Sequence, residues 1–224
     1  MIFYIGCCLG SFCDLVSYRL INNQNWIFER SYCESCNKQL KLIHTLPIIS
    51  YLFLKGRCPY CHKKINRMHL FIEIISGIST CLLCFYTHHW LLKLMMMMIL
   101  LIISLMDIRK MYFDGRLLMW LLGFSIINAI YHNTFIECIC GLCCLSLPLM
   151  LFKKYIGEGD LWLLAIMGIS LKCKGIFVAF FIAVQLGVMY SIILVIFLKK
   201  KIKNPIPFCP FISIGVFFTF LLGL

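Results

Sequence analysis

Residues 175–198 read GIFVAFFIAVQLGVMYSIILVIFL, and none of these 24 side chains carries a charge. About twenty apolar residues in a row let a helix cross the hydrocarbon core of a bilayer. Residues 90–106 form a second such stretch, in which Lys93 is the one charged side chain. The chain of 224 residues is 62% hydrophobic and 13% charged, whereas soluble domains are roughly 45–50% apolar and about 25% charged. The sequence therefore predicts an all-α, polytopic membrane protein.

Apolar runs of this kind predict about eight transmembrane helices. The sixth run is short, and only His88 and His89 separate the second from the third. The first run has no positively charged segment before it, so we expect an uncleaved span rather than a signal peptide. The expected spans are Ile2–Leu20, His69–Thr87, Trp90–Met106, Leu117–Tyr131, Phe135–Phe152, Leu161–Leu171, Gly175–Leu198 and Phe208–Leu224.

Basic residues are distributed unevenly between the two sides that these spans define. All of the 21 Lys and Arg residues except Lys93, Lys172 and Lys174 fall on one side, which comprises Arg19 and the loops at residues 22–68, 107–116, 153–160 and 199–207. Because positively charged loops stay in the cytoplasm, we expect these loops inside the cell and both termini outside. The net charge of +12 then reflects topology and contact with anionic lipid, and it does not predict a nucleic-acid partner.

Four of the 15 cysteines form two CxxC pairs in the first of these loops. Cys33 and Cys36 are followed, after 21 residues, by Cys58 and Cys61. Two such pairs supply four thiolates for a tetrahedral metal ion, and Zn²⁺ is the metal that such sites most often hold. Because four thiolates close the coordination sphere, we expect a structural zinc clip without a catalytic metal.

Two of the nine carboxylates, Asp107 and Asp160, stand at the ends of expected spans and at the same membrane depth. Taken alone, Asp107 would pair with Arg109 or Lys110 at the interface, and Asp160 would cap the helix that follows it. Taken together, the two aspartates predict aspartic proteolysis, because neighbouring carboxylates cannot both ionise cheaply. The ionised carboxylate would draw a proton from water, and the protonated one would donate to the peptide carbonyl.

Other polar or flexible residues are expected to support this pair. Gly157 and Gly159 directly precede the second aspartate, and glycines let the backbone approach an extended peptide closely. We expect Asp114 to cap the fourth span or to add a supporting charge. Glu73, inside the second span, is expected to pair with a loop Lys or Arg or to contact a substrate amine. Asp14, in the first span, is expected to form a bond across helices.

The chain resembles the type IV prepilin peptidases, including their shorter late-competence forms, through motifs that recur in order along nearly its whole length. The motifs are Gly10–Phe12 with Tyr18–Leu20, Arg30–Cys36, Leu46–Leu52, Gly56–Cys61, Glu73, Gly157–Asp160 and Pro207–Phe211. Two positions depart from the family pattern. Tyr112-Phe113-Asp114 stands where the family usually has Ile-Pro-Asp, and Cys209 replaces a small residue, usually glycine.

This resemblance implies a membrane aspartic endopeptidase that removes the leader peptide from prepilins or pseudopilins at the cytoplasmic face. Such enzymes cut after a glycine, just before a hydrophobic helix. The resemblance further implies that Asp107 and Asp160 are catalytic. It also implies that the cysteine loop is the metal-binding domain, which the family links to methylation of the new amino terminus with S-adenosylmethionine.

These features divide the chain into three expected parts: a first span at residues 1–22, the four-cysteine cytoplasmic loop at 23–68 and a peptidase bundle at 69–224. Proteins with two other functions would share some of these features. A proton-coupled transporter would place its carboxylates near the bilayer midplane and contain an internal repeat, and neither is predicted here. A non-catalytic, zinc-clipped scaffold of a pilus or competence machine would bind prepilin without shortening it.

Overall fold

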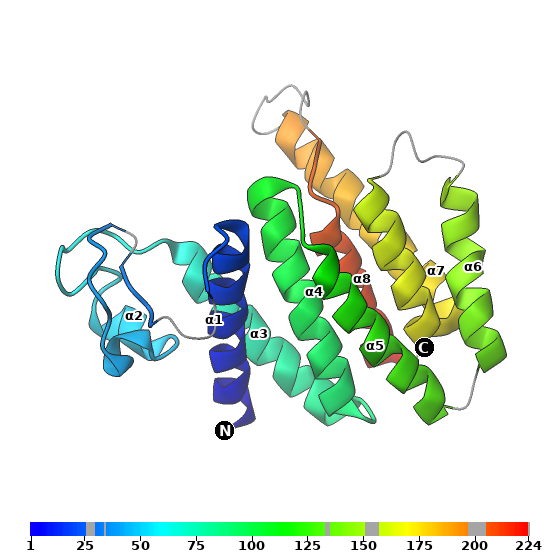
Figure 1. Cartoon of the computed structure of the whole chain (residues 1–224), viewed down its shortest axis with the longest axis horizontal. Coiled ribbons are helices and arrows are strands. Elements are labelled where there is room, and N and C mark those ends of the chain that lie inside the picture. The colour runs from blue at the N-terminus through cyan, green and yellow to red at the C-terminus, as the bar shows by residue number, and fades with distance from the viewer. Residues whose placement is uncertain (26–29, 34, 133–134, 151–156, 197–204, 224) are drawn as a thin grey trace. The chain divides into compact units, whose positions relative to one another are not determined.

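The computed structural model describes residues 1–25, 30–33, 35–132, 135–150, 157–196 and 205–223 (Figure 1). Nearly all of the ordered structure over these residues is helical, and its β-structure consists of two isolated antiparallel bridges. The predicted all-α fold is therefore confirmed. Four helices within the described ranges are long and apolar enough to cross a membrane, namely α1 (Ile2–Ile21), α3 (Arg67–Tyr86), α4 (Trp90–Lys110) and α7 (Glu158–Ile196). The chain is therefore a multi-pass membrane protein.

Shorter helices occupy the other expected spans and part of the cysteine loop. They are η1 (Leu42–Thr45), α2 (Ile49–Phe53), α5 (Gly115–His132), α6 (Phe135–Met150) and α8 (Cys209–Leu222).

The sixth and seventh expected spans are both found in α7. Lys172 interrupts this helix with a left-handed backbone conformation (φ 59°, ψ −175°) and divides it into two arms. The interruption lies between residues 171 and 175, where the sequence predicts a break.

The described chain forms two compact units, Met1–Phe85 and Tyr86–Leu224. In the first unit, α1 and α3 approach closely because small residues face each other. A Cβ added to Gly10 would lie 1.9 Å from Ser76 Oγ, and the Ser76 hydroxyl donates a hydrogen bond to the carbonyl of Gly6 at 2.8 Å. Gly6 and Gly10 are four residues apart, the spacing with which glycines let two membrane helices pack backbone to backbone.

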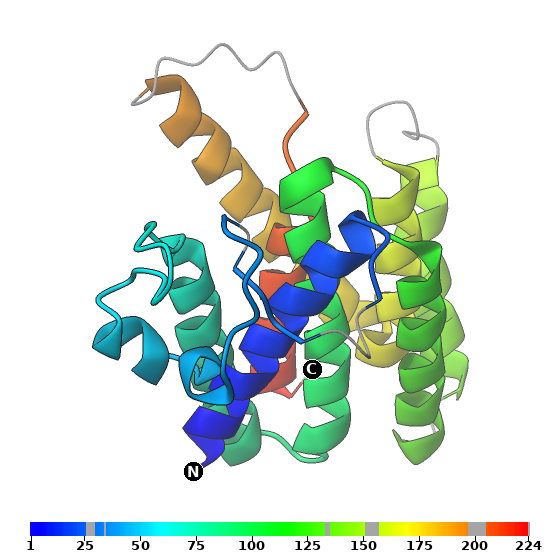
Figure 2. The same ribbon diagram turned by 60° about the vertical axis from the view of Figure 1, so that its left-hand side comes forward.

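In the second unit, α6 lies beside the first arm of α7, and α8 packs against both α4 and α7 (Figures 1 and 2). A Cβ on Gly141 of α6 would lie 2.2 Å from the carbonyl oxygen of Gly168 in α7. The hydroxyls of Ser104 in α4 and Ser213 in α8 are hydrogen bonded at 2.7 Å. These close contacts hold α4 and α7, the helices that carry the two predicted catalytic aspartates, against their neighbours.

Candidate active site

Asp107 and Asp160 meet at the amino end of α8. Asp107, near the end of α4 and 8% exposed, accepts a hydrogen bond from the backbone N–H of Cys209 at 3.1 Å. Asp160, in the first turn of α7, accepts a hydrogen bond from the Cys209 thiol at 3.0 Å. Cys209 is fully buried. One residue therefore joins the two carboxylates that the sequence placed at one depth.

The start of α8 explains why Asp107 lies there. The first N–H groups of a helix have no acceptor within the helix, and the partial positive charge at this end favours a carboxylate. Cys209 is the first residue of α8, and a proline stands in the same first turn. Asp107 supplies the missing acceptor from another helix. The departure from the family pattern at Cys209 thus places a thiol between the two acidic side chains.

Gly159 brings the loop after α4 against the first turn of α7. A Cβ on Gly159 would lie 2.5 Å from Cζ of Phe113, so the aromatic ring occupies the space that a side chain would need. A Cβ on Gly157 would lie 3.2 Å from Oδ2 of Asp160. The sequence identified position 113 only as one where the family usually has a proline. It did not predict that the Phe113 ring would pack on the Gly-x-Gly-Asp motif.

Asp114 stands immediately before α5, as a helix cap does. Its carboxylate accepts the backbone N–H of Arg116 at 2.9 Å and the Arg116 Nε–H at 2.7 Å. Hydrogen bonding from the Arg116 side chain lowers the pKa of Asp114 below its usual value. Its carboxylate is therefore engaged at the start of α5, in the capping position that the sequence predicts.

The four cysteines of the loop gather as expected. The sulfur atoms of Cys33, Cys36, Cys58 and Cys61 all lie within 4.8 Å of one another, and those of Cys33 and Cys61 are 3.9 Å apart. A tetrahedral ion with Zn–S bonds of about 2.3 Å would hold its sulfurs about 3.8 Å apart. The cluster therefore has the size and the donor set for such a metal ion.

Both cysteine pairs adopt the same backbone turn. In the first, the Cys33 N–H donates to Lys38 and the Asn37 N–H donates to Cys33, at 3.0 and 2.8 Å. In the second, the Cys58 N–H donates to Lys63 and the His62 N–H donates to Cys58, both at 3.0 Å. Asn37 and His62, which follow the second cysteine of each pair, both have positive φ (53° and 57°).

The second turn also favours a thiolate. Burial disfavours ionisation of Cys58, but backbone N–H groups of Cys61 and Tyr60 and the neighbouring thiols outweigh it and lower the pKa of Cys58 to about 7. A thiolate is the form of cysteine that binds a metal.

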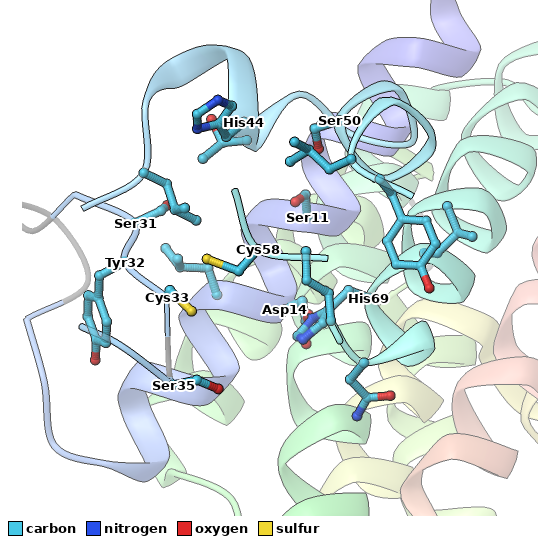
Figure 3. A pocket seen from close by; sticks show the side chains of 18 of the residues that line it. Ser11, Asp14, Ser31, Tyr32, Cys33, Ser35, His44, Ser50, Cys58 and His69 are labelled. Carbon is cyan, nitrogen blue, oxygen red and sulfur yellow. The ribbon is translucent and has the colours of Figure 1, made fainter. Parts of the chain in front are cut away.

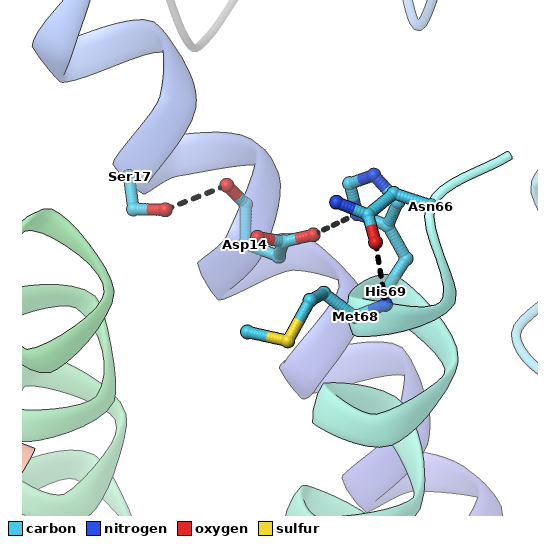
Figure 4. A network of polar contacts seen from close by, with 5 residues as sticks. All are labelled: Asp14, Ser17, Asn66, Met68 and His69. Atoms are coloured by element: carbon cyan, nitrogen blue, oxygen red, sulfur yellow. Dashed lines mark hydrogen bonds and ion pairs between the residues drawn. The ribbon is translucent and has the colours of Figure 1, made fainter. Parts of the chain in front are cut away.

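A cavity of about 340 Å³ lies in the first unit, bordered by α1, α3 and the cysteine loop (Figure 3). The carboxylate of Asp14 is hydrogen bonded to Nδ1 of His69 across α1 and α3, as the sequence predicts for Asp14 (Figure 4). Glu73 also lines this cavity. We expected a loop Lys or Arg, or a substrate amine, as the partner of Glu73. Within the described structure its carboxylate accepts the backbone N–H of Ile48 at 2.8 Å, because α2 begins beside it.

When the chain is compared with known sequences, both units match profiles of leader-peptidase domains. The family profile described as "Bacterial Peptidase A24 N-terminal domain" matches residues 4–87, and the profile of the "Type IV leader peptidase family" matches residues 94–192. No solved structure matches the chain.

Several characterised proteins named prepilin leader peptidase/N-methyltransferase are similar over most of their length. The relative from Bacillus subtilis (strain 168) is 27% identical, covering 100% of this chain and 94% of its own. The relative from Dichelobacter nodosus is 27% identical over 89% of this chain and 73% of its own. The relative from Burkholderia pseudomallei (strain 1026b) is 26% identical over 98% of this chain and 84% of its own.

Proposed function

This chain belongs to the type IV leader peptidase family, and we propose on that premise that Asp107 and Asp160 are the catalytic pair with which it cleaves the leader from type IV prepilins. The observation that carries the proposal is that both carboxylates are hydrogen bonded to Cys209.

The proposed reaction is hydrolysis of a peptide bond without a covalent intermediate. The ionised aspartate takes a proton from water, and the water oxygen attacks the carbonyl carbon of the leader's last residue. The protonated aspartate gives its proton to the carbonyl oxygen. As the resulting tetrahedral intermediate collapses, the aspartate that took the proton from water gives it to the nitrogen and the C–N bond breaks. The other aspartate takes back a proton from a hydroxyl of the intermediate, which leaves a carboxyl group and an amine. Gly157 supports this role because it has no side chain to crowd the Asp160 carboxylate, whereas the space beside Gly159 is taken by the Phe113 ring.

The test is to express each of Asp107→Asn and Asp160→Asn with a prepilin and to follow shortening of the prepilin on gels. Either substitution removes a proton carrier, and we expect cleavage to fall by at least about a thousandfold. Asp114→Asn is the matched control, because it neutralises an aspartate that is paired with Arg116. Parental cleavage by either catalytic variant would refute the assignment.

We further propose that the chain crosses the membrane about eight times, with both termini outside and the catalytic pair at the cytoplasmic face. The uneven distribution of Lys and Arg supports this orientation. In functional terms, residues 1–22 are the first span, 23–68 the metal loop and 69–224 the peptidase bundle. The ion proposed for the four thiolates is Zn²⁺, held as a structural clip, because four protein ligands leave no open coordination position.

Methylation of the new amino terminus is proposed as a second activity, because the similar proteins carry N-methyltransferase in their names. S-adenosylmethionine would supply the methyl group. Mass spectrometry of the amino terminus of a co-expressed prepilin reports the cleavage position and the methyl group together. A non-catalytic scaffold would leave that prepilin at its full length.

A further inference from the structure

Glu73 is a nearly buried carboxylate that forms no ion pair with another described residue. Only 9% of it is exposed, and its Oε2 accepts a hydrogen bond from the neutral backbone N–H of Ile48. Among the described residues no Lys, Arg or His forms an ion pair with it. Burial of a carboxylate without a counter-charge is unfavourable. Its position on the wall of the cavity therefore suits a ligand that brings a positive charge.

The other charged groups deep in this cavity are already engaged. Asp14 is bonded to His69 (Figure 4), and the buried Arg19 donates to two backbone carbonyls of the loop, at 3.3 and 3.1 Å. Lys63 and Lys64 line the cavity too, but both side chains are exposed. Glu73 therefore remains available as the counter-ion of an incoming cation.

A second polar group in the cavity is also unsatisfied. Nδ1 of His44 is buried and has no hydrogen-bond partner among the described residues. His44 lines the same cavity as Glu73 (Figure 3). A buried polar atom without a partner usually indicates a missing water or ligand. The cavity therefore has an unsatisfied polar group in its wall in addition to the Glu73 carboxylate.

We propose that this cavity binds the ammonium group of a peptide amino terminus, with Glu73 as its counter-ion. An ammonium carries three N–H donors and a positive charge, which a carboxylate such as that of Glu73 can accept and neutralise. Leu15 and Leu70 give the cavity apolar walls beside Glu73, which suits a terminus with an apolar first side chain. The inference rests on the proposed function, because cleavage of a prepilin leader creates such a terminus.

The test is binding of a short peptide amide that begins Leu-Ile and has a free amino terminus. Its N-acetylated form is the neutral control. Affinities are measured by calorimetry on the purified full chain, for the parent and for Glu73→Gln. The glutamine carbonyl can still accept the Ile48 N–H, so the variant removes the charge and keeps the local bond. We expect the parent to bind the free peptide at least about tenfold more tightly than the acetylated one, and Glu73→Gln to lose that preference.

Glu137→Gln is the matched variant, because it neutralises an exposed carboxylate of the second unit that pairs with Lys172. It should keep the preference of the parent. A parent that binds both peptides alike would overturn the proposal, as would a Glu73→Gln variant that retains the preference. The first comparison needs no variant, so misfolding cannot mask it. Binding of a ready-made terminus needs no hydrolysis, so failure here is distinct from failure of prepilin cleavage in the same preparation.

Discussion

At the scale of single residues, the environment of Asp160 depends on a glycine that has no room for a side chain. The ring of Phe113 lies where the Cβ of any other residue at 159 would be. The contact links the loop after α4 to the first turn of α7. A methyl group here must displace either the ring or the helix turn that positions Asp160.

Gly159→Ala is therefore expected to lower prepilin cleavage about tenfold, since overpacking of this kind costs roughly 1–3 kcal/mol. Adding Phe113→Ala should restore much of the rate, because it frees the space. The rates are compared in a cleavage assay with purified enzyme. Gly115→Ala is the control, because no atom lies within 4 Å of the added Cβ. Equal rates for the Gly159 variant and the parent would contradict this account of the contact.

At the scale of helices, the bundle is held by places where backbones touch. Gly141 of α6 and Gly168 of α7 leave no space between them, and Gly215 of α8 stands in the same relation to Ala179, whose carbonyl oxygen would lie 2.2 Å from an added Cβ. A backbone cannot move aside as a flexible side chain can. Close approach of this kind drives helix association in membranes, where burial of apolar surface provides little.

Gly141→Ala should consequently separate α6 from the first arm of α7 and lower the melting temperature of the detergent-solubilised protein by roughly 2–10 °C. Gly123→Ala in α5 serves as the control, since its added Cβ meets nothing within 4 Å. Thermal unfolding followed by tryptophan fluorescence measures both variants. Equal melting temperatures for the two glycine variants would contradict this explanation.

The cysteine loop is an element whose structure we expect to depend on a metal ion. Its β-structure within the described residues amounts to the two bridges Tyr32–Gln39 and Arg57–Lys64. Such small amounts of regular structure leave a metal site to supply much of the folding free energy.

Chelation, or the double variant Cys33→Ser with Cys58→Ser, should release one equivalent of zinc, measured by plasma mass spectrometry, and make residues 23–68 sensitive to protease. Prepilin cleavage should persist while methylation is lost, because the proposed catalytic aspartates lie in the other unit. Cys140→Ser, outside the cluster and exposed, should retain the zinc. Loss of cleavage at the same rate as loss of zinc would show that the clip serves hydrolysis as well.

At the scale of the whole molecule, the orientation in the membrane follows from the sum of many weak preferences of single Lys and Arg residues. Alkaline phosphatase fused after His89 or at the carboxyl terminus should be active, since both points are expected outside. Fusions after Asn66 or Arg116 should be inactive and should fluoresce when green fluorescent protein replaces the phosphatase. The reverse pattern would invert the proposed topology.

The sequence sufficed for those features that depend on composition or on local spacing. The length of the uncharged runs predicted the helices, the break near Lys172 and a membrane protein. The CxxC spacing predicted the cluster of thiols. The expected membrane depth, which is the same for both residues, suggested that Asp107 and Asp160 would lie near each other.

Contacts that depend on which face of each helix meets its neighbour could not be predicted. Lipid is as apolar as a helix interface, so the hydrophobic pattern does not distinguish the two. The packing of Phe113 on Gly159, the bridging position of Cys209 and the bond from Ile48 to Glu73 all depend on such choices.

The interruption of α7 at Lys172 has a consequence for how this helix is held in the membrane. The first arm has about 14 residues and rises roughly 21 Å, which is well short of the ~30 Å thickness of hydrocarbon. Most of its residues are buried against the rest of the protein, and Trp162 is the one large apolar side chain that the arm exposes. We therefore expect neighbouring helices, rather than lipid, to accommodate the hydrophobic mismatch. The depth of Asp160 is then set by the packing of the bundle and not by the length of the span that carries it.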